Sequence, residues 1–402
     1  MGCSCACPFW RRAWQVWGLW CLLVSAAPAA DVCQPAVWPQ WEQFAQRHVQ
    51  PDGRVVDYSV PQQQSTSEGQ SYAMFFALVA RDRERFDRLW TWSVMNLTGG
   101  DIGARLPAWQ WGRHNDGRWG VLDSNSASDA DLWFAYALFE AGRVWREPGY
   151  TTQAKSLLAQ VAAQEVAPLP GLGPMLLPAP KGFVFKERIW RLNPSYLPLP
   201  LLRAFERLNA DGPWKAMALS YERMLAETTP HGFAPDWVAY EVPEGAMRGA
   251  FVRDPEKGDL GSYDAIRTYL WAGMTPVSDK LAPLLRKRLD GMARMLHTSA
   301  VPPEKVSTST GQANGPGPVG FSAALLPYLQ TMGAKSVLKG QQDRVQAQLL
   351  QAPSGAMPPY YDQVLGLFAM GWMEQRYRFL PGGRLQLRWE KACPPKSATT
   401  KP

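Results

Sequence analysis

The 402-residue sequence contains little cysteine and little histidine. Four of its six cysteines fall within the first 21 residues, and its four histidines lie far apart, with no spacing typical of metal ligands. A histidine metal site is therefore not expected. After residue 30 the chain also lacks a C-x-x-C pair, a Walker A loop and a G-x-S-x-G elbow, and it offers no motif for the chemistries that those patterns support.

Charged residues are also sparse, at 19% of the chain against 46% hydrophobic residues, a balance that fits a folded globular protein. The net charge is +7, and two of these charges, Arg11 and Arg12, lie in a segment that we expect to be removed. The remaining excess is small and scattered, so the sequence does not predict nucleic-acid binding. The mean hydropathy of -0.26 argues against a protein with several membrane spans.

Tryptophan, by contrast, is abundant, with 19 residues in the chain. The indole ring has flat apolar faces and a polar edge, which suits a partner that also has flat apolar faces. Sugar rings are such partners. The composition therefore favours a carbohydrate ligand.

The first 30 residues have the pattern of a secretory signal peptide. Arg11 and Arg12 precede an apolar run over residues 13–24, and small residues follow at 25–30. A single membrane anchor is the alternative, although residues 13–30 are slightly shorter than the ~20 needed to span a bilayer and contain Gln15 and Pro28. We expect cleavage of residues 1–30 and a periplasmic or secreted mature protein.

Removal of this segment leaves two cysteines, Cys33 near the start of the mature chain and Cys393 near its end. Because exported proteins commonly form disulfides, we expect a bond between Cys33 and Cys393 that joins the termini. Two free cysteines are the alternative. Residues 393–402 are expected to form a C-terminal tail.

Apolar residues recur at helical spacing in about twelve stretches separated by Pro or Gly, and no long strand is predicted. The expected helices begin near residues 37, 68, 83, 128, 150, 195, 213, 262, 278, 320, 335 and 359. Connections that follow the even-numbered helices are short, and those that lead into them are long. Since helices joined by short turns lie antiparallel, the long loops gather at one end, where a site would be built.

The even-numbered helices are also the more apolar, and a helix that is apolar on nearly all sides is buried. We therefore predict an all-α fold, an (α/α)6 barrel of about six inner and six outer helices, as a single domain over residues 31–392. Two separate bundles are the alternative, but no linker interrupts the pattern. Small β-hairpins are expected in the long loops, for example from Trp109 to Val121.

Polar clusters fall at the starts of the even-numbered helices. In the first, residues 66–72, Glu68 is a candidate acid beside a Gly that would let a ligand approach. The structural alternative is a capping box, in which Ser65 pairs with Glu68 or Ser67 with Gln70. A capping box would need no function.

The second cluster, residues 122–131, holds three aspartates. One aspartate in the first turn of a helix is explained by the helix dipole, which it stabilises by ~0.3–1 kcal/mol. Asp129 and Asp131 point about 200° apart on a helix. We therefore expect at most one to face the cavity and the other to cap or pair.

The third cluster places Asp264 and Arg267 three residues apart on one helical face. An ordinary i,i+3 ion pair is the structural alternative. The functional interpretation is that Arg267 keeps Asp264 ionised, as a general base must be. A fourth cluster, residues 190–196, could offer a stacking ring and a hydroxyl.

Together, four stretches of this sequence resemble glycoside hydrolase family 8, and more closely its branch of endoglucanases that accompany bacterial cellulose synthesis. The stretches read TSEGQSY at 66–72, LDSNSASDAD at 122–131, NPSY at 193–196 and SYDAIR at 262–267. The resemblance runs from about Trp38 to Trp389. The family signature usually has Ile or Met where Phe134 stands, a change that leaves the acids unaffected.

This resemblance implies an (α/α)6 barrel with an open cleft that cleaves β-1,4-glucan internally and inverts the anomeric carbon. Glu68 matches the proton donor and Asp264 the base that activates water. Asp129 is the signature aspartate, which we expect to contact the sugar at the cleavage subsite. Tyr196 and Arg267 match residues that help place the water.

The expected substrate-binding residues are Trp190 and Asn193 of the fourth cluster, and Trp109 and Trp111 of the long loop that carries the expected hairpin. The resemblance implies no metal and no organic cofactor. It implies β-1,4-glucan as the partner, a link to the cellulose synthase export complex, and no nucleic acid. We expect a monomer.

Two other functions would fit parts of this pattern. A polysaccharide lyase on a similar helical barrel would act on uronates and need a basic cleft, whereas the clusters here are acidic. A non-catalytic glucan-binding scaffold of an export complex would keep the tryptophans without needing Glu68 and Asp264. Activity of variants at these two carboxyls distinguishes the scaffold from the enzyme.

Overall fold

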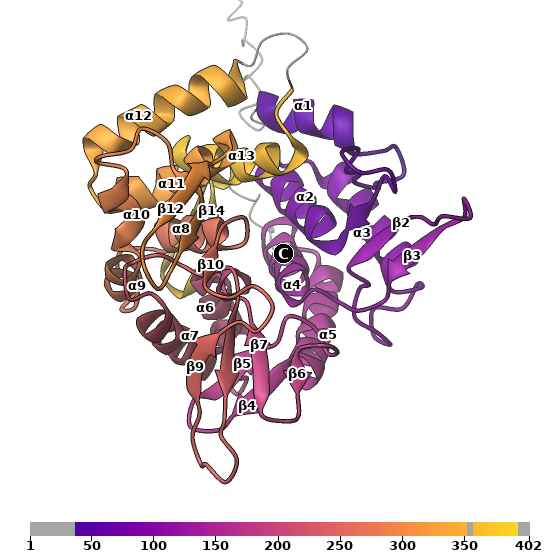
Figure 1. Ribbon diagram of the computed structural model, residues 1–402. Helices are drawn as coiled ribbons and strands as arrows, with labels where there is room; N and C mark the ends of the chain where they lie inside the picture. The colour runs from indigo at the N-terminus through magenta and orange to yellow at the C-terminus, as the bar shows by residue number, and fades with distance from the viewer. Residues whose placement is uncertain (1–36, 352–356, 393–402) are drawn as a thin grey trace, which may run out of the picture. The chain divides into compact units, whose positions relative to one another are not determined.

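The computed structural model describes residues 37–351 and 357–392 of the chain (Figure 1). The expected signal segment, the Cys33–Cys393 pair and the C-terminal tail lie outside these residues and stay predictions. The helices are α1 (Pro39–His48), α2 (Ser67–Val79), α3 (Arg83–Leu97), α4 (Ser128–Trp145), α5 (Pro148–Gln164), α6 (Leu199–Leu208), α7 (Trp214–Thr228), α8 (Ala265–Met274), α9 (Ala282–Arg288), α10 (Asp290–Met295), α11 (Val319–Thr331), α12 (Lys335–Val345), α13 (Tyr360–Met373) and α14 (Arg388–Ala392).

Six of these helices contact one another in a closed ring. Their order is α2, α4, α6, α8, α11 and α13, and α13 contacts α2 again. Each ring helix also contacts a helix that lies farther out in Figure 1, in the pairs α1 with α13, α3 with α2, α5 with α4, α7 with α6, α9 with α8 and α12 with α11. The alternation of buried and outer helices predicted from the connection lengths is confirmed.

The burial of the ring helices follows from their composition. In α2 every residue except Glu68 is buried, whereas in the outer helix α12 only Val337, Gln341 and Val345 are. Because α2 has no solvated face, its apolar residues pack on all sides. Glu68 is therefore the one residue of α2 that is partly exposed.

A short hairpin packs at the end of the ring away from Glu68. Strand β13 (Tyr377–Phe379) pairs with β14 (Leu385–Leu387), and the Tyr377 ring packs edge-on against Phe75 of α2 at 5.0 Å. The Tyr136 hydroxyl of α4 donates to the Gly383 carbonyl at 2.9 Å. Aromatic packing thus fills this end and leaves the polar helix starts at the other.

The long loops contain more strands than the sequence predicted. The expected hairpin is present as β2 (Gln110–Arg113) and β3 (Trp119–Asp123). A four-stranded sheet, order β6-β7-β8-β9, was not predicted, because its strands have two to four residues and two loops distant in the chain contribute to it. Its strands are β6 (Val184–Phe185), β7 (Ile189–Leu192), β8 (Val238–Glu241) and β9 (Ala250–Arg253).

The remaining short elements complete the loops. The strands are β1 (Ser65–Thr66), β4 (Val166–Leu169), β5 (Gly173–Leu176), β10 (Leu260–Gly261), β11 (Pro303–Ser307) and β12 (Ala313–Pro316), and the single-turn helices are η1 (Pro194–Tyr196), η2 (Gln346–Leu350) and η3 (Pro381–Gly383). None of the helices within residues 37–351 and 357–392 has the length and apolar character needed to cross a membrane.

Candidate active site

Glu68 lies in the first turn of α2, and its carboxyl group is free of a capping role. The cap is Thr66, whose hydroxyl oxygen accepts from the Gly69 N–H at 3.1 Å. The side chain of Gln70 is occupied elsewhere, since it bonds the backbone of Gly53 and the hydroxyl of Ser93. Both capping-box alternatives are therefore wrong, because a threonine between the two serines takes the cap.

Gly69 makes room for a neighbouring side chain rather than for a ligand. A Cβ at this position would come within 2.5 Å of the Tyr360 hydroxyl, which belongs to α13. The expectation that this Gly lets a ligand approach Glu68 is replaced by a packing role. Close contact between α2 and α13 requires that no side chain stand here.

Asp129 lies at the start of α4 and is almost fully buried, with 1% of its surface exposed. The Tyr72 hydroxyl donates to its Oδ2 at 3.3 Å, and the Ala130 N–H donates to its Oδ1 at 2.8 Å. Tyr72 stands one helical turn after Glu68 on the same face of α2. The starts of α2 and α4 thus meet at this aspartate.

Arg267 joins Asp129 to residues from three other segments. Its Nη2 donates to Asp264 Oδ1 at 3.0 Å and lies 3.9 Å from Asp129 Oδ2. The same nitrogen donates to the Ser195 hydroxyl at 2.9 Å, and Nη1 donates to the Tyr361 hydroxyl at 3.1 Å. The predicted ion pair between Asp264 and Arg267 is confirmed, and the arginine does more than pair.

Asp264 is the more open carboxylate, with 31% of its side chain exposed. Its Oδ2 accepts from the Trp237 indole N–H at 3.0 Å. The first turn of α8 is capped by a residue from a distant loop, Asp236, whose Oδ1 accepts from the N–H groups of Asp264 and Ala265 at 3.0 and 2.7 Å. Trp237 and Asp236 were missed by the sequence analysis, because neither stands in a recognisable motif.

Burial and neighbouring charges give Glu68 and Asp129 different pKa values. Loss of hydration raises the pKa of Glu68 to about 8, and the nearby charges of Asp129 and Asp264 act in the same direction. Burial also raises the pKa of Asp129, to about 6, against the opposing effect of Arg267. Glu68 is thus the group in this cluster that keeps its proton at neutral pH.

A second acidic pair lies behind the first. Asp131 and Glu165 are both fully buried and interact with each other, and the Ser126 hydroxyl donates to Glu165 at 2.6 Å. Burial and the facing carboxyl group raise the pKa of Asp131 well above its ordinary value, and burial raises that of Glu165 to about 8. The two aspartates of α4 therefore have different partners, as their 200° separation predicted.

The remaining predicted residues have mixed placements. Tyr196 lies beside the cluster, with its ring 6.0 Å from the Arg267 guanidinium. Trp111 stacks on Trp119 at 5.6 Å in the β2–β3 hairpin, and Trp119 is 46% exposed. Trp119 was not among the predicted residues, although its place in the predicted hairpin was a usable signal.

Trp109, Trp190 and Asn193 differ in exposure. Trp109 is partly buried just before β2, and its carbonyl accepts from the N–H of Ser67, the first residue of α2, at 2.9 Å. Trp190 is buried in β7, and Asn193 is 2% exposed, with its Oδ1 accepting from the Ser195 N–H at 3.0 Å. These placements favour structural roles for Trp190 and Asn193, and their assignment to sugar binding stays a prediction.

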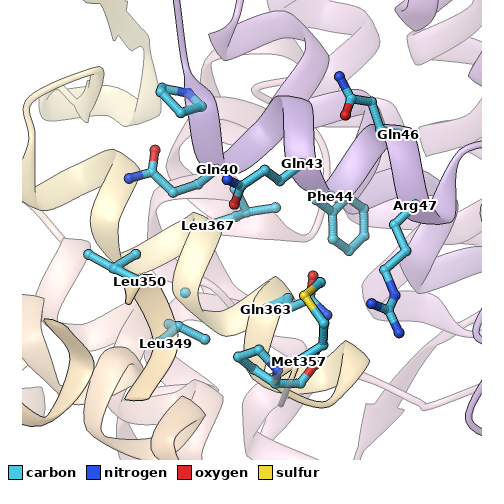
Figure 2. A pocket seen from close by; sticks show the side chains of 13 residues that line it. Gln40, Gln43, Phe44, Gln46, Arg47, Leu349, Leu350, Met357, Gln363 and Leu367 are labelled. Carbon is cyan, nitrogen blue, oxygen red and sulfur yellow. The ribbon is translucent and has the colours of Figure 1, made fainter. Parts of the chain in front are cut away.

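The described residues contain no group of three or more His, Cys, Asp or Glu arranged to hold a metal ion. A cavity of about 650 Å³ lies away from the cluster, between α1 and α13, and Figure 2 shows Gln40, Phe44 and Leu367 among its lining residues. No carboxylate lines it among the residues that the structure describes. The cluster of Glu68, Asp129 and Asp264 therefore lies outside this cavity.

The arrangement suits cleavage of a glycosidic bond. Such hydrolysis needs one carboxyl group that holds a proton and one carboxylate, placed on either side of the scissile bond. Glu68 and Asp264 come from helices at opposed positions in the ring, and Arg267 lies 3.0 Å from Asp264 and 3.9 Å from Asp129. Three exposed or partly exposed aromatic residues, Trp111, Trp119 and Trp237, lie in the adjoining loops.

Comparison with known proteins gives a consistent result. Residues 13–375 match the family described as Glycosyl hydrolases family 8. An endoglucanase from Xanthomonas axonopodis pv. citri (strain 306) is 49% identical over 384 residues, which cover 95% of this chain and 97% of that protein. An endoglucanase from Escherichia coli (strain K12) is 45% identical over 372 residues, which cover 92% and 96%.

A solved structure also matches over most of its length. The endo-1,4-D-glucanase from Vibrio fischeri ES114 has a TM-score of 0.82 at 40% identity, covering 88% of this chain and 99% of that one. These matches agree with the order of the motifs in the sequence and with the clustering of their acids in the structure. The chain belongs to glycosyl hydrolase family 8.

Proposed function

We propose that this glycosyl hydrolase is an endo-β-1,4-glucanase that acts with inversion at the anomeric carbon. The observation that carries the proposal is the meeting of Asp129 and Asp264 at Arg267, with Glu68 near enough for the charges of all three to act on its pKa. The names of the relatives, endoglucanase and endo-1,4-D-glucanase, supply the substrate class. We further propose that the closed ring and its outer helices form the (α/α)6 barrel of the family.

In this mechanism Glu68 is the general acid. Its raised pKa keeps it protonated at neutral pH, so it can transfer a proton to the glycosidic oxygen as the bond to the anomeric carbon breaks. The leaving chain departs as an alcohol, and Glu68 becomes a carboxylate. The desolvation that raises its pKa is what keeps this proton available for transfer near neutrality.

Asp264 is the general base. It takes a proton from a water molecule whose oxygen forms the new bond to the anomeric carbon on the face opposite the leaving group. Arg267 donates to Asp264, and the Tyr196 ring lies near the same guanidinium, so both are placed to order the water. Proton exchange with solvent then returns Glu68 and Asp264 to their starting states.

Asp129 has a supporting role in this proposal. Both of its carboxylate oxygens already accept hydrogen bonds, from Tyr72 and from the Ala130 N–H. A buried carboxylate held this way suits contact with a sugar hydroxyl at the cleavage subsite, where hydrogen bonds strengthen as the ring distorts. It is less suited to attack on carbon.

Cellulose is uncharged, so affinity must come from stacking and hydroxyl hydrogen bonds. Trp111 and Trp109, with the exposed Trp119, are proposed as the stacking residues on the loop between α3 and α4. We also propose an exported, monomeric enzyme that acts on nascent glucan beside a cellulose synthase export complex. The secretory pattern of residues 1–30 supports the location.

The test compares hydrolysis with binding in two variants. We expect Glu68→Gln and Asp264→Asn each to lower hydrolysis of carboxymethylcellulose roughly 100- to 10,000-fold, because general acid–base catalysis contributes on that order. Binding of cello-oligosaccharide, measured by calorimetry, should persist within a few-fold. Near-normal turnover in either variant would remove that residue from its role and favour a non-catalytic glucan-binding protein.

A further inference from the structure

Two consecutive residues, Asp236 and Trp237, contact Asp264 from a loop that precedes β8. The Asp236 carboxylate is 7% exposed, and its Oδ1 accepts from three backbone N–H groups, those of Ser262, Asp264 and Ala265, at 2.7, 3.0 and 2.7 Å. One oxygen thus caps α8 from outside the helix. It fixes the backbone of Asp264 itself.

Trp237 holds the side chain of the same residue. Its indole N–H donates to Asp264 Oδ2 at 3.0 Å, while Arg267 donates to Oδ1 at 3.0 Å. With one donor on each oxygen, rotation of the carboxylate about its last bond would break two hydrogen bonds. The carboxylate plane is therefore fixed, and each oxygen keeps a lone pair for another partner.

The indole is itself held in place by packed groups. The Phe183 ring lies parallel to it, with centroids 5.7 Å apart and planes at 6°, and the Arg191 guanidinium lies 5.0 Å from its centroid. Arg191 is fixed by a buried two-bond ion pair with Asp254, at 2.7 and 3.0 Å. The hydrogen bond to Asp264 thus comes from a supported donor.

We propose that Asp236 and Trp237 are positioning residues for the general base, one acting on the backbone of Asp264 and the other on its carboxylate. This inference rests on the proposed role of Asp264. A base must present one oxygen to the water at a defined angle, and small displacements of a reacting group cost large factors in rate. Neither residue needs to touch the substrate to have this effect.

The first variant is Trp237→Phe, which keeps an aromatic ring and removes the N–H donor. We expect kcat on a cello-oligosaccharide to fall roughly 10- to 100-fold, because a hydrogen bond to a charged group is lost. KM should stay within about twofold. Trp145→Phe is the matched control and should leave kcat unchanged. Trp145 ends α4, outside the acidic cluster, and its ring lies 5.0 Å from that of Phe86 on α3.

The second comparison separates the acceptor at position 236 from its charge. In Asp236→Asn one side-chain oxygen can still accept the three N–H bonds, so kcat should stay within about threefold of wild type. In Asp236→Ala the acceptor is gone, and kcat should fall as in Trp237→Phe. If Asp236→Ala fails to fold, the kcat values of Asp236→Asn and Trp237→Phe still test the proposal.

Wild-type enzyme in the same assay separates the two proposals. A wild type without cello-oligosaccharide hydrolysis would contradict the proposed function. An active wild type with unchanged kcat in Trp237→Phe would overturn the positioning role alone. A rise in KM at constant kcat would also overturn it, because Trp237 would then be a substrate-stacking residue.

Discussion

Two buried groups of carboxyls lie on opposite sides of the first turn of α4, and they differ in what surrounds them. Asp129 faces Arg267, Tyr72 and the other acids of the site. Asp131 faces Glu165, a second carboxyl group. Burial raises the pKa of both aspartates, so burial alone does not distinguish a catalytic acid from a structural one.

The two groups differ in the cation Arg267, which lies beside Asp129. Arg267 lies against Asp129 and Asp264 and opposes the rise in the pKa of Asp129, whereas the pKa of Glu68 is raised to about 8, so Glu68 keeps its proton. The groups that act on the Asp131–Glu165 pair are Ser126 and further carboxylates, so this pair must keep a proton to remain buried. We expect a proton held by this pair to take no part in the chemistry of the site.

Among the tests of this contrast between the two groups, the largest effect is expected from removing the cation. In Arg267→Gln the hydrogen bond to Asp264 becomes neutral and the charge beside Asp129 disappears, so we expect kcat to fall about 100-fold. Steady-state kinetics on cello-oligosaccharide measure this. Arg203→Gln removes a comparable ion pair, to Asp279 at 2.8 Å, and should lower stability without this loss of kcat. Equal losses of kcat in the two variants would mean that Arg267 has no special role in the acidic cluster.

An intermediate effect is expected in the pH–rate profile. The acid must be protonated, and the pKa of Glu68 is raised to about 8 by burial and by the charges of Asp129 and Asp264. Activity should therefore be retained below pH 8 and fall about tenfold per pH unit above it. A profile of kcat/KM from pH 5 to 10 tests this. A decline that begins near pH 5 would mean that Glu68 is not the acid.

The smallest effect concerns the second pair. Because the folded-state pKa of Glu165 is raised to about 8, the folded protein holds more protons than the unfolded chain between pH 4.5 and 8. The stability from this group is present below its unfolded pKa and is lost as pH rises through 8. Glu165→Gln should therefore reduce the fall in Tm between pH 5 and 9 by several degrees.

Calorimetry at the two pH values measures that change, and kcat at pH 6 should stay within a few-fold of wild type. An unchanged pH dependence of Tm would mean that the pair does not store a proton. A 100-fold loss of kcat would place Glu165 in the catalytic cluster and remove the contrast between the two groups.

Much of the fold was predictable because its signals are local. Pro and Gly punctuation and apolar runs located the helix starts within a few residues, for example 128 for α4 and 335 for α12. The same starts carry Glu68, Asp129 and Asp264, so alternating loop lengths were enough to predict that the three acids share one end. The capping residue of α2 was not predicted, since three neighbouring hydroxyl residues competed for it.

The residues that were missed act across long separations in the chain. Asp236 caps a helix 28 residues later, and Tyr361 of α13 contacts Arg267 of α8. Glu165 meets Asp131 only because α5 folds back along α4. The β6–β9 sheet depends likewise on two loops meeting. No periodicity encodes such contacts, which depend on the assembled ring.

The most direct test of the paired carboxyls is the stereochemistry of the first product. Proton NMR during digestion of a defined β-1,4 cello-oligosaccharide follows the anomer formed before mutarotation. With Glu68 as acid and Asp264 directing water to the opposite face, the α-anomer should appear first. The β-anomer as first product would require attack by a protein carboxylate and would contradict this mechanism.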